Sequence, residues 1–72
     1  MPEPRIGIYP GTFDPLTNGH MDIINRSTKV VGTLIVCVAE HTGKDTLFTL
    51  RERLAMVQEE VNNLDAAIKA VV

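Results

Sequence analysis

The stretch Tyr9-Pro-Gly-Thr-Phe-Asp-Pro-Leu-Thr-Asn-Gly-His20 separates an apolar run from an amphipathic run, which is typical of a loop that joins a strand to a helix. It contains two glycines, two prolines and two threonine hydroxyls, and it ends on a histidine where the helix should begin. A loop of this composition is suited to holding phosphate groups, because the free N–H groups and the dipole of a helix N-terminus favour an anion. Nucleotide chemistry is therefore the leading hypothesis.

The segments on either side of this loop predict two strands and a helix. Residues 5–9 read as a short strand that Pro10 and Gly11 end. Apolar residues three or four positions apart predict a helix over residues 19–31, with Gly32 as its stop. Residues 33–39 are rich in Ile, Val and Leu without strict alternation, which favours a strand buried on both faces.

The second half of the chain predicts another helix and another strand. Thr49 and Glu52 have the spacing of a capping box that begins a helix. Its apolar residues at positions 50, 54, 57, 61 and 64 share one face, and the charged run Arg51-Glu-Arg53 is expected on the exposed face. Residues 67–72 predict a third strand.

The alternating order of strands and helices predicts an α/β fold with a parallel sheet and right-handed crossovers. Two helices over three strands would leave apolar surface uncovered. Residues 1–72 are therefore expected to be the N-terminal half of a larger domain, apparently truncated. In isolation this piece is expected to fold poorly or to self-associate.

Composition narrows the class of protein further. The chain has 72 residues and a net charge of −2, so it lacks the basic surface typical of nucleic-acid-binding proteins. Cys37 is the single cysteine, which excludes an intrachain disulfide, and a buried, inert thiol is expected. The N-terminus does not resemble a signal peptide, and the longest apolar stretch is too short to span a bilayer, so a cytoplasmic protein is expected.

The opening loop should lie at the carboxyl edge of the sheet, where α/β folds bind ligands. Gly11 and Gly19 would let a phosphate approach the backbone closely, and His20 would present a ring N–H beside the amides of the first helical turn. Neither G-x-x-x-x-G-K-[ST] nor G-x-G-x-x-G is present, so a P-loop NTPase and a dinucleotide-dependent dehydrogenase are not favoured.

Two separated motifs carry a resemblance to a known family. Residues 11–15, GTFDP, followed by residues 17–20, TNGH, resemble the nucleotidylyltransferase superfamily. Within it, the stretch from Tyr9 to His20 is similar to the phosphopantetheine adenylyltransferase family. Residues 44–53, KDTLFTLRER, are similar to that family's K-x-x-x-F-[ST]-x-x-E-R segment. The resemblance implies a Rossmann-like nucleotidylyltransferase fold whose first half is β-α-β-α-β.

The resemblance also implies a reaction and roles for single residues. AMP would pass from ATP to 4′-phosphopantetheine with Mg2+, giving dephospho-coenzyme A and pyrophosphate. His20 matches the histidine that steadies the α-phosphate, and Thr12 matches a residue that contacts the phosphate and the nucleotide. Phe13 matches a position whose backbone meets ATP, and Lys44 matches a catalytic lysine that binds the phosphopantetheine phosphate. A homo-oligomer, hexameric in the family, is implied, with no metal-ligating residue assigned and no nucleic-acid or membrane partner.

Several alternatives stay open at this stage. The chain could be another nucleotidylyltransferase, of the nicotinate-nucleotide or glycerol-phosphate type, although those usually have histidine in place of Thr17. It could also be a non-catalytic truncated fragment. His20 could simply cap its own helix, and Lys44 could be a solvated loop residue. Asp14 and Asp22 fit a turn and a first helical turn better than a metal site.

Overall fold

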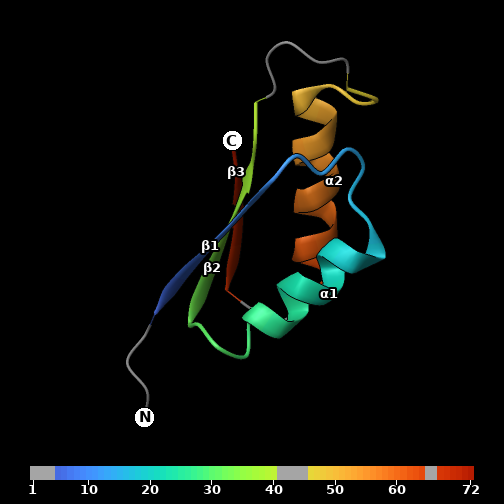
Figure 1. Ribbon diagram of the computed structural model, residues 1–72. Coiled ribbons are helices and arrows are strands. Elements are labelled where there is room, and N and C mark those ends of the chain that lie inside the picture. Colours follow the sequence, from blue (N-terminus) through green and yellow to red (C-terminus); the bar gives the residue numbers. More distant parts are fainter. Residues whose placement is uncertain (1–4, 41–45, 65–66) are drawn as a thin grey trace.

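The computed structural model describes residues 5–40, 46–64 and 67–72, and these form three strands alternating with two helices (Figure 1). The elements in chain order are β1 (Ile6–Gly11), α1 (Asn18–Ser27), β2 (Thr33–Val38), α2 (Leu50–Asn62) and β3 (Ile68–Val71). The strands form one parallel sheet in the order β1-β2-β3. The predicted Rossmann-like β-α-β-α-β fold is therefore confirmed.

Both helices pack on the same face of the sheet (Figure 1). The strands follow one another across the sheet in one direction, so two crossovers of the same hand place their helices on the same side. The prediction that β2 is buried on both faces is wrong for this reason. Leu34, Val36 and Val38 are buried beneath the helices, whereas the alternate residues of β2 are only half-buried.

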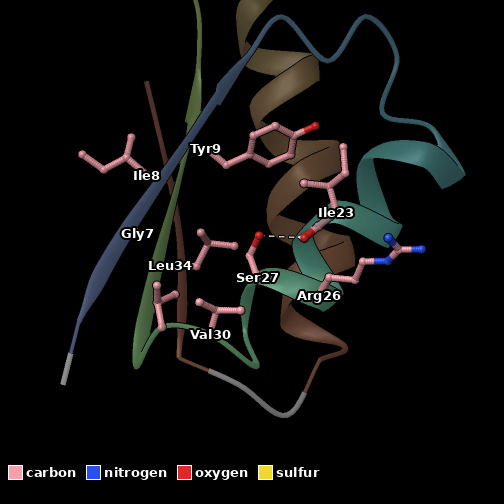
Figure 2. A pocket seen from close by; sticks show the side chains of 9 residues that line it. Gly7, Ile8, Tyr9, Ile23, Arg26, Ser27, Val30 and Leu34 are labelled. Atoms are coloured by element: carbon pink, nitrogen blue, oxygen red, sulfur yellow. Dashed lines mark hydrogen bonds between the residues drawn. The ribbon is translucent and has the colours of Figure 1, made fainter. Parts of the chain in front are cut away.

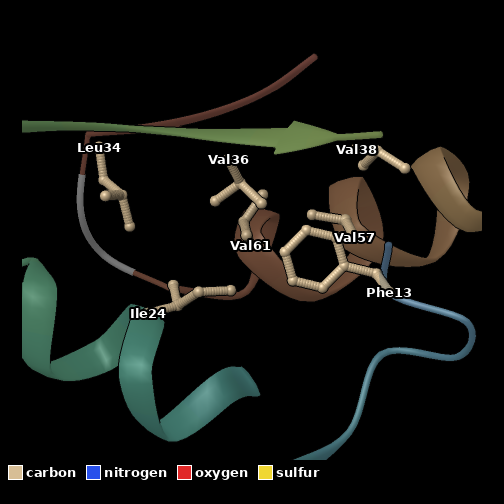
Figure 3. Close-up of a cluster of buried hydrophobic side chains, with 7 residues drawn as sticks. All are labelled: Phe13, Ile24, Leu34, Val36, Val38, Val57 and Val61. Carbon is tan, nitrogen blue, oxygen red and sulfur yellow. The ribbon is translucent and has the colours of Figure 1, made fainter. Parts of the chain in front are cut away.

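The core lies between β2 and the two helices (Figure 3). Ile24 of α1 and Val57 and Val61 of α2 pack toward the buried face of β2, as the apolar spacing of both helices predicted. One core side chain, Phe13, comes from the loop that follows β1 and is 1% exposed. The loop after β1 is thus anchored in the core.

The ends of β1 and α1 differ most from the sequence-based expectation. β1 continues through Pro10 to Gly11, because Gly11 pairs with Val38 and its carbonyl accepts from the Ala39 amide at 2.8 Å. α1 ends at Ser27, four residues before the expected Val31. The Ser27 hydroxyl donates to the Ile23 carbonyl at 2.7 Å, and such bonding to the preceding turn weakens a helix and often bends it.

The sheet face opposite the helices carries apolar side chains in the open. Ile6 and Ile8 are 69% and 66% exposed. Cys37 is half-buried on this face rather than buried as expected. The sequence predicts an uncovered apolar face. Because both helices lie on the other side of the sheet, neither of them covers this face.

A groove of about 360 Å³ lies between β1 and the C-terminal half of α1 (Figure 2). Its walls are largely apolar and include Tyr9 of β1 and Ile23 and Val30 from the α1 side. The groove lies toward the end of α1, away from the loop that opens α1, and of the described site residues Thr12, Phe13 and His20 none lines it. Over the described segments, neither helix has the length and apolar character needed to cross a membrane.

Candidate functional site

The candidate site lies where β1 and β2 end side by side. Gly11 and Val38 are the last residues of these two strands and are register partners. The loop that leads to α1 leaves from Gly11, and the chain that leads toward α2 leaves from Val38. The carboxyl ends of parallel strands are the usual place for a ligand in α/β folds. The fold therefore brings the two sequence motifs to one edge of the sheet.

Phe13 anchors the first of these loops. Its φ angle of 52° lies in the left-handed region, which a non-glycine residue adopts at a cost of roughly 1–2 kcal/mol. Its ring is buried and packs edge-on against Tyr9 and His20, with centroid distances of 5.5 and 4.9 Å. A Cβ at Gly11 would come within 2.8 Å of this ring. Gly11 is thus needed for the packing of Phe13.

His20 forms a capping box with Thr17, the N-cap residue of α1. The Thr17 amide donates to His20 Nδ1 at 3.0 Å, and the His20 amide donates to Thr17 Oγ1 at 3.3 Å. His20 therefore caps its own helix, and this cap determines which ring nitrogen of the neutral imidazole carries the proton. A backbone amide can only donate, so Nδ1 is the acceptor and the neutral imidazole carries its proton on Nε2. The cap fixes the tautomer and leaves an Nε2–H to donate.

A capping box also begins α2, but the residue three positions after its N-cap is glutamate instead of histidine. There Thr49 caps the helix and the Glu52 carboxylate accepts from the Thr49 amide at 3.0 Å. Hydrogen bonds from the Thr49 backbone and side chain hold the pKa of Glu52 below its usual value. α1 has histidine instead and no acidic residue in its first turn, so the expectation that Asp22 lies there is wrong. The first turn of α1 therefore adds no negative charge to the positive end of the helix dipole, which favours the binding of an anion there.

Asp14 connects the first loop to the segment that enters α2. Its two carboxylate oxygens accept from the amides of Leu47 and Phe48, at 2.7 and 2.8 Å. The expectation that Asp14 stabilises a local turn misses this bond, since the partners lie more than thirty residues away. Asp14 thus fixes the position of the second motif relative to the first.

Arg53 makes a second connection from within α2. It is 2% exposed, so its expected place on the exposed face is wrong. Its Nη1 donates to the carbonyls of Thr12 and Ala39, both at 2.9 Å, and its Nε donates to the Phe48 carbonyl at 3.2 Å. Hydrogen bonds from a charged donor contribute about 1.5–3 kcal/mol each. One side chain therefore joins the loop after β1, the end of β2 and the start of α2.

The sequence contains a signal for Arg53 but none for Asp14. Arg53 lies four residues before Val57 and eight before Val61, on the apolar face of the predicted helix. A charge on such a face indicates a buried, hydrogen-bonded group rather than a solvated one. The partners of Asp14 are backbone amides, and no residue type marks them in a sequence.

Three of the four predicted site residues, Thr12, Phe13 and His20, lie within the described part of the structure. Thr12 is exposed at the carboxyl edge of the sheet, and His20 is half-buried at the start of α1. The Phe13 side chain faces the core, which leaves only its backbone for the predicted contact with ATP. Lys44 lies outside the described residues, as does His41. The catalytic and binding roles of all four predicted residues remain predictions.

The described donors do not form a metal site. Across residues 5–40, 46–64 and 67–72 there is no cluster of three or more His, Cys, Asp or Glu side chains. Both oxygens of Asp14 already accept amide hydrogens, and Asp22 pairs with Arg26 at 3.2 Å on the surface. These side chains therefore do not fit a protein-held Mg2+, which prefers one or two free carboxylates and substrate phosphates.

Comparison of the sequence with known proteins finds named relatives. Phosphopantetheine adenylyltransferase of Caulobacter sp. (strain K31) is 57% identical over 60 residues, which are 83% of this chain and 37% of the relative. The enzyme of the same name from Rhodospirillum rubrum is 55% identical over 64 residues, 89% of this chain and 37% of the relative. The enzyme of the same name from Helicobacter pylori (strain G27) is 59% identical over 54 residues, which are 75% of this chain and 34% of the relative.

The chain thus spans about a third of the length of these curated relatives. The cytidylyltransferase-like family model matches residues 8–70, from the middle of β1 into β3, and includes the candidate site. The resemblance stated from the two motifs is confirmed by this match and by the relatives. The chain belongs to the cytidylyltransferase-like family.

Proposed function

We propose that this chain supplies the phosphate-binding loop and the histidine of an adenylyltransferase that moves AMP from ATP to 4′-phosphopantetheine. The observation that carries the proposal is the histidine capping box of α1, which leaves an Nε2–H to donate at the start of a helix whose first turn has no acidic residue. The names of the relatives favour this substrate pair over others in the family.

The reaction joins two anions, so it needs positioning and charge neutralisation more than covalent chemistry. A phosphate oxygen of 4′-phosphopantetheine attacks the α-phosphorus of ATP, the new P–O bond forms, and the bond to the β-phosphate oxygen breaks. Pyrophosphate leaves with that oxygen. His20 donates from Nε2 to an α-phosphoryl oxygen as its charge grows, and the first amides of α1 donate beside it. Thr12 contacts the phosphate, and Lys44 binds the phosphate of the acceptor.

Mg2+ belongs to the substrate in this proposal. When bound, Mg2+ would be supplied together with ATP and would neutralise phosphate charge, since the described side chains include no cluster suited to ligating it. Within the chain, the positive end of α1 and the ring of His20 then act on the α-phosphate. The proposal also includes assembly into a homo-oligomer, which the family resemblance implies.

The test is pyrophosphate release by the natural chain at its full length. Release that needs both ATP and 4′-phosphopantetheine supports the proposal, and His20→Ala should lower kcat by about 10²–10³-fold, the usual effect of losing one such donor. Release with nicotinate mononucleotide, or with CTP and glycerol phosphate, would instead assign another reaction of the superfamily. A His20→Ala variant with nearly normal kcat would refute the role of the histidine.

A further inference from the structure

Two side chains outside the predicted site connect its two halves. Asp14 accepts from the amides of Leu47 and Phe48, and Arg53 donates to the Phe48 carbonyl. Phe48 is therefore held through both its N–H and its carbonyl. Arg53 also donates to the Thr12 carbonyl, so it contacts the backbone on both sides.

We propose that Asp14 and Arg53 are positioning residues that lock the phosphate loop, residues 12–14, to the entry of α2, residues 46–48. The proposal rests on the proposed function, because the loop carries the Thr12 that contacts phosphate in it. Neither side chain is assigned to substrate. Arg53 is buried, and both oxygens of Asp14 are occupied by amides.

The phosphate loop is held on both sides of Phe13, by Arg53 at Thr12 and by the carboxylate of Asp14. The phosphate loop includes a residue in the left-handed region, Phe13, which persists only where its surroundings determine it. Arg53 holds the carbonyl immediately before it, and Asp14 is the residue immediately after it. Loss of either bond lets the loop relax relative to α1 and α2. A displacement of about 1 Å in a positioned site can lower the rate roughly 10²-fold.

Lysine cannot replace Arg53 in this arrangement. Three carbonyls accept from two different nitrogens of one planar guanidinium, and a single ammonium cannot reach all three directions from the end of its flexible stem. Arg53→Lys therefore keeps the charge and breaks the lock. Arg51→Lys is the matched control, since Arg51 is exposed two residues earlier on the same helix.

The kinetic experiment measures kcat and KM per folded molecule, in the natural chain at its full length and well below its melting temperature. Arg53→Lys should lower kcat and kcat/KM together by roughly 10²-fold, because the lock acts mainly in the transition state. Arg51→Lys should stay within about twofold of wild type, as surface substitutions usually do. An Arg53→Lys variant with kcat within about twofold of wild type would overturn the proposal.

Amide hydrogen exchange separates local loosening from general loss of stability. The amides of Leu47 and Phe48 should exchange faster in both Arg53→Lys and Asp14→Asn, while amides in the middle of β2 keep their wild-type protection. Asp22→Asn, an exposed aspartate of α1, is the control for the second variant. Equal acceleration everywhere would mean a purely structural role and would refute the lock.

The two readouts also separate the lock from the proposed function. A wild-type chain that releases no pyrophosphate with ATP and 4′-phosphopantetheine would refute the function, while exchange at Leu47 and Phe48 would still decide the lock. If Arg53→Lys does not fold, Asp14→Asn carries both measurements. Its kcat should fall at least tenfold, since a 1 Å displacement lowers rates by up to about 10²-fold, and an unchanged kcat with unchanged exchange would overturn the proposal.

Discussion

Adding one methyl group at Gly11 tests whether the phosphate loop is held by the core. In Gly11→Ala the new Cβ would lie 2.8 Å from Phe13 Cζ and 3.0 Å from Cε2, where ordinary contact begins at 3.4 Å. The Phe13 ring would have to move by several tenths of an ångström. It is 1% exposed and packs against Tyr9 and His20, so it has little room to do so.

The expected cost follows from overpacking a buried ring. Forcing extra volume into a well-packed core costs about 1–3 kcal/mol. Because the ring contacts the imidazole of His20 at a centroid distance of 4.9 Å, its displacement also disturbs the Thr17–His20 cap. We therefore expect Gly11→Ala to lower both the free energy of unfolding and the turnover rate.

Gly19 offers a matched control of opposite sign. A Cβ there meets only Thr17 Oγ1, at 3.6 Å, and Gly19 lies inside α1. Gly19→Ala should raise the free energy of unfolding by up to about 1 kcal/mol, because alanine favours the helix more than glycine. If a phosphate approaches the backbone at this point, the same variant should raise the KM for ATP. Stability and substrate binding would then change in opposite directions.

Urea unfolding of the natural chain at its full length measures the first effect, and pyrophosphate release measures the second. The midpoint of unfolding should fall in Gly11→Ala and rise in Gly19→Ala, with the slope unchanged in both. A Gly11→Ala variant as stable as wild type would refute the reasoning, since it would mean that the Phe13 ring does not occupy the position described. Gly19→Ala with wild-type KM would remove the argument for close approach of a phosphate.

Three further perturbations follow from the caps and the open sheet face. The pKa of Glu52 is lowered in the folded chain, so its bonds to Thr49 contribute stability above its ordinary pKa, and this is lost as the pH falls through the lowered value. Glu52→Gln should weaken the acid-induced loss of stability in urea titrations at falling pH; an unchanged profile would contradict this. Thr17→Ala should cost about 1 kcal/mol in urea unfolding, because it removes the hydroxyl that accepts from the His20 amide, whereas Thr17→Ser should leave the stability nearly unchanged. Ile8→Thr should reduce self-association of residues 1–72 in sedimentation, because Ile8 is 66% exposed on the uncovered face; equal association would place the contact elsewhere.

Local patterns predicted those parts of the fold that depend on neighbours in sequence. The apolar spacing of both helices, the capping box at Thr49 and the strand over residues 33–38 are all present. The prediction that α1 extends to Val31 is wrong, since the helix ends at Ser27, whose hydroxyl donates to the Ile23 carbonyl. The prediction that Arg53 is exposed is wrong because its position on the apolar face of α2, and not its charge, decides its burial.

The sequence by itself determined the alternating α/β order, the loop before α1 and the family, since hydrophobic periodicity and two spaced motifs depend only on residues close together in the chain. Only the tertiary structure decided which face of the sheet the helices cover and how residues 12–14 are tied to the entry of α2. The side chains of Asp14 and Arg53 bond to backbone groups up to 41 residues away in the sequence. Every residue carries the same backbone N–H and carbonyl groups apart from proline, so the choice of partner is made by packing and not by sequence.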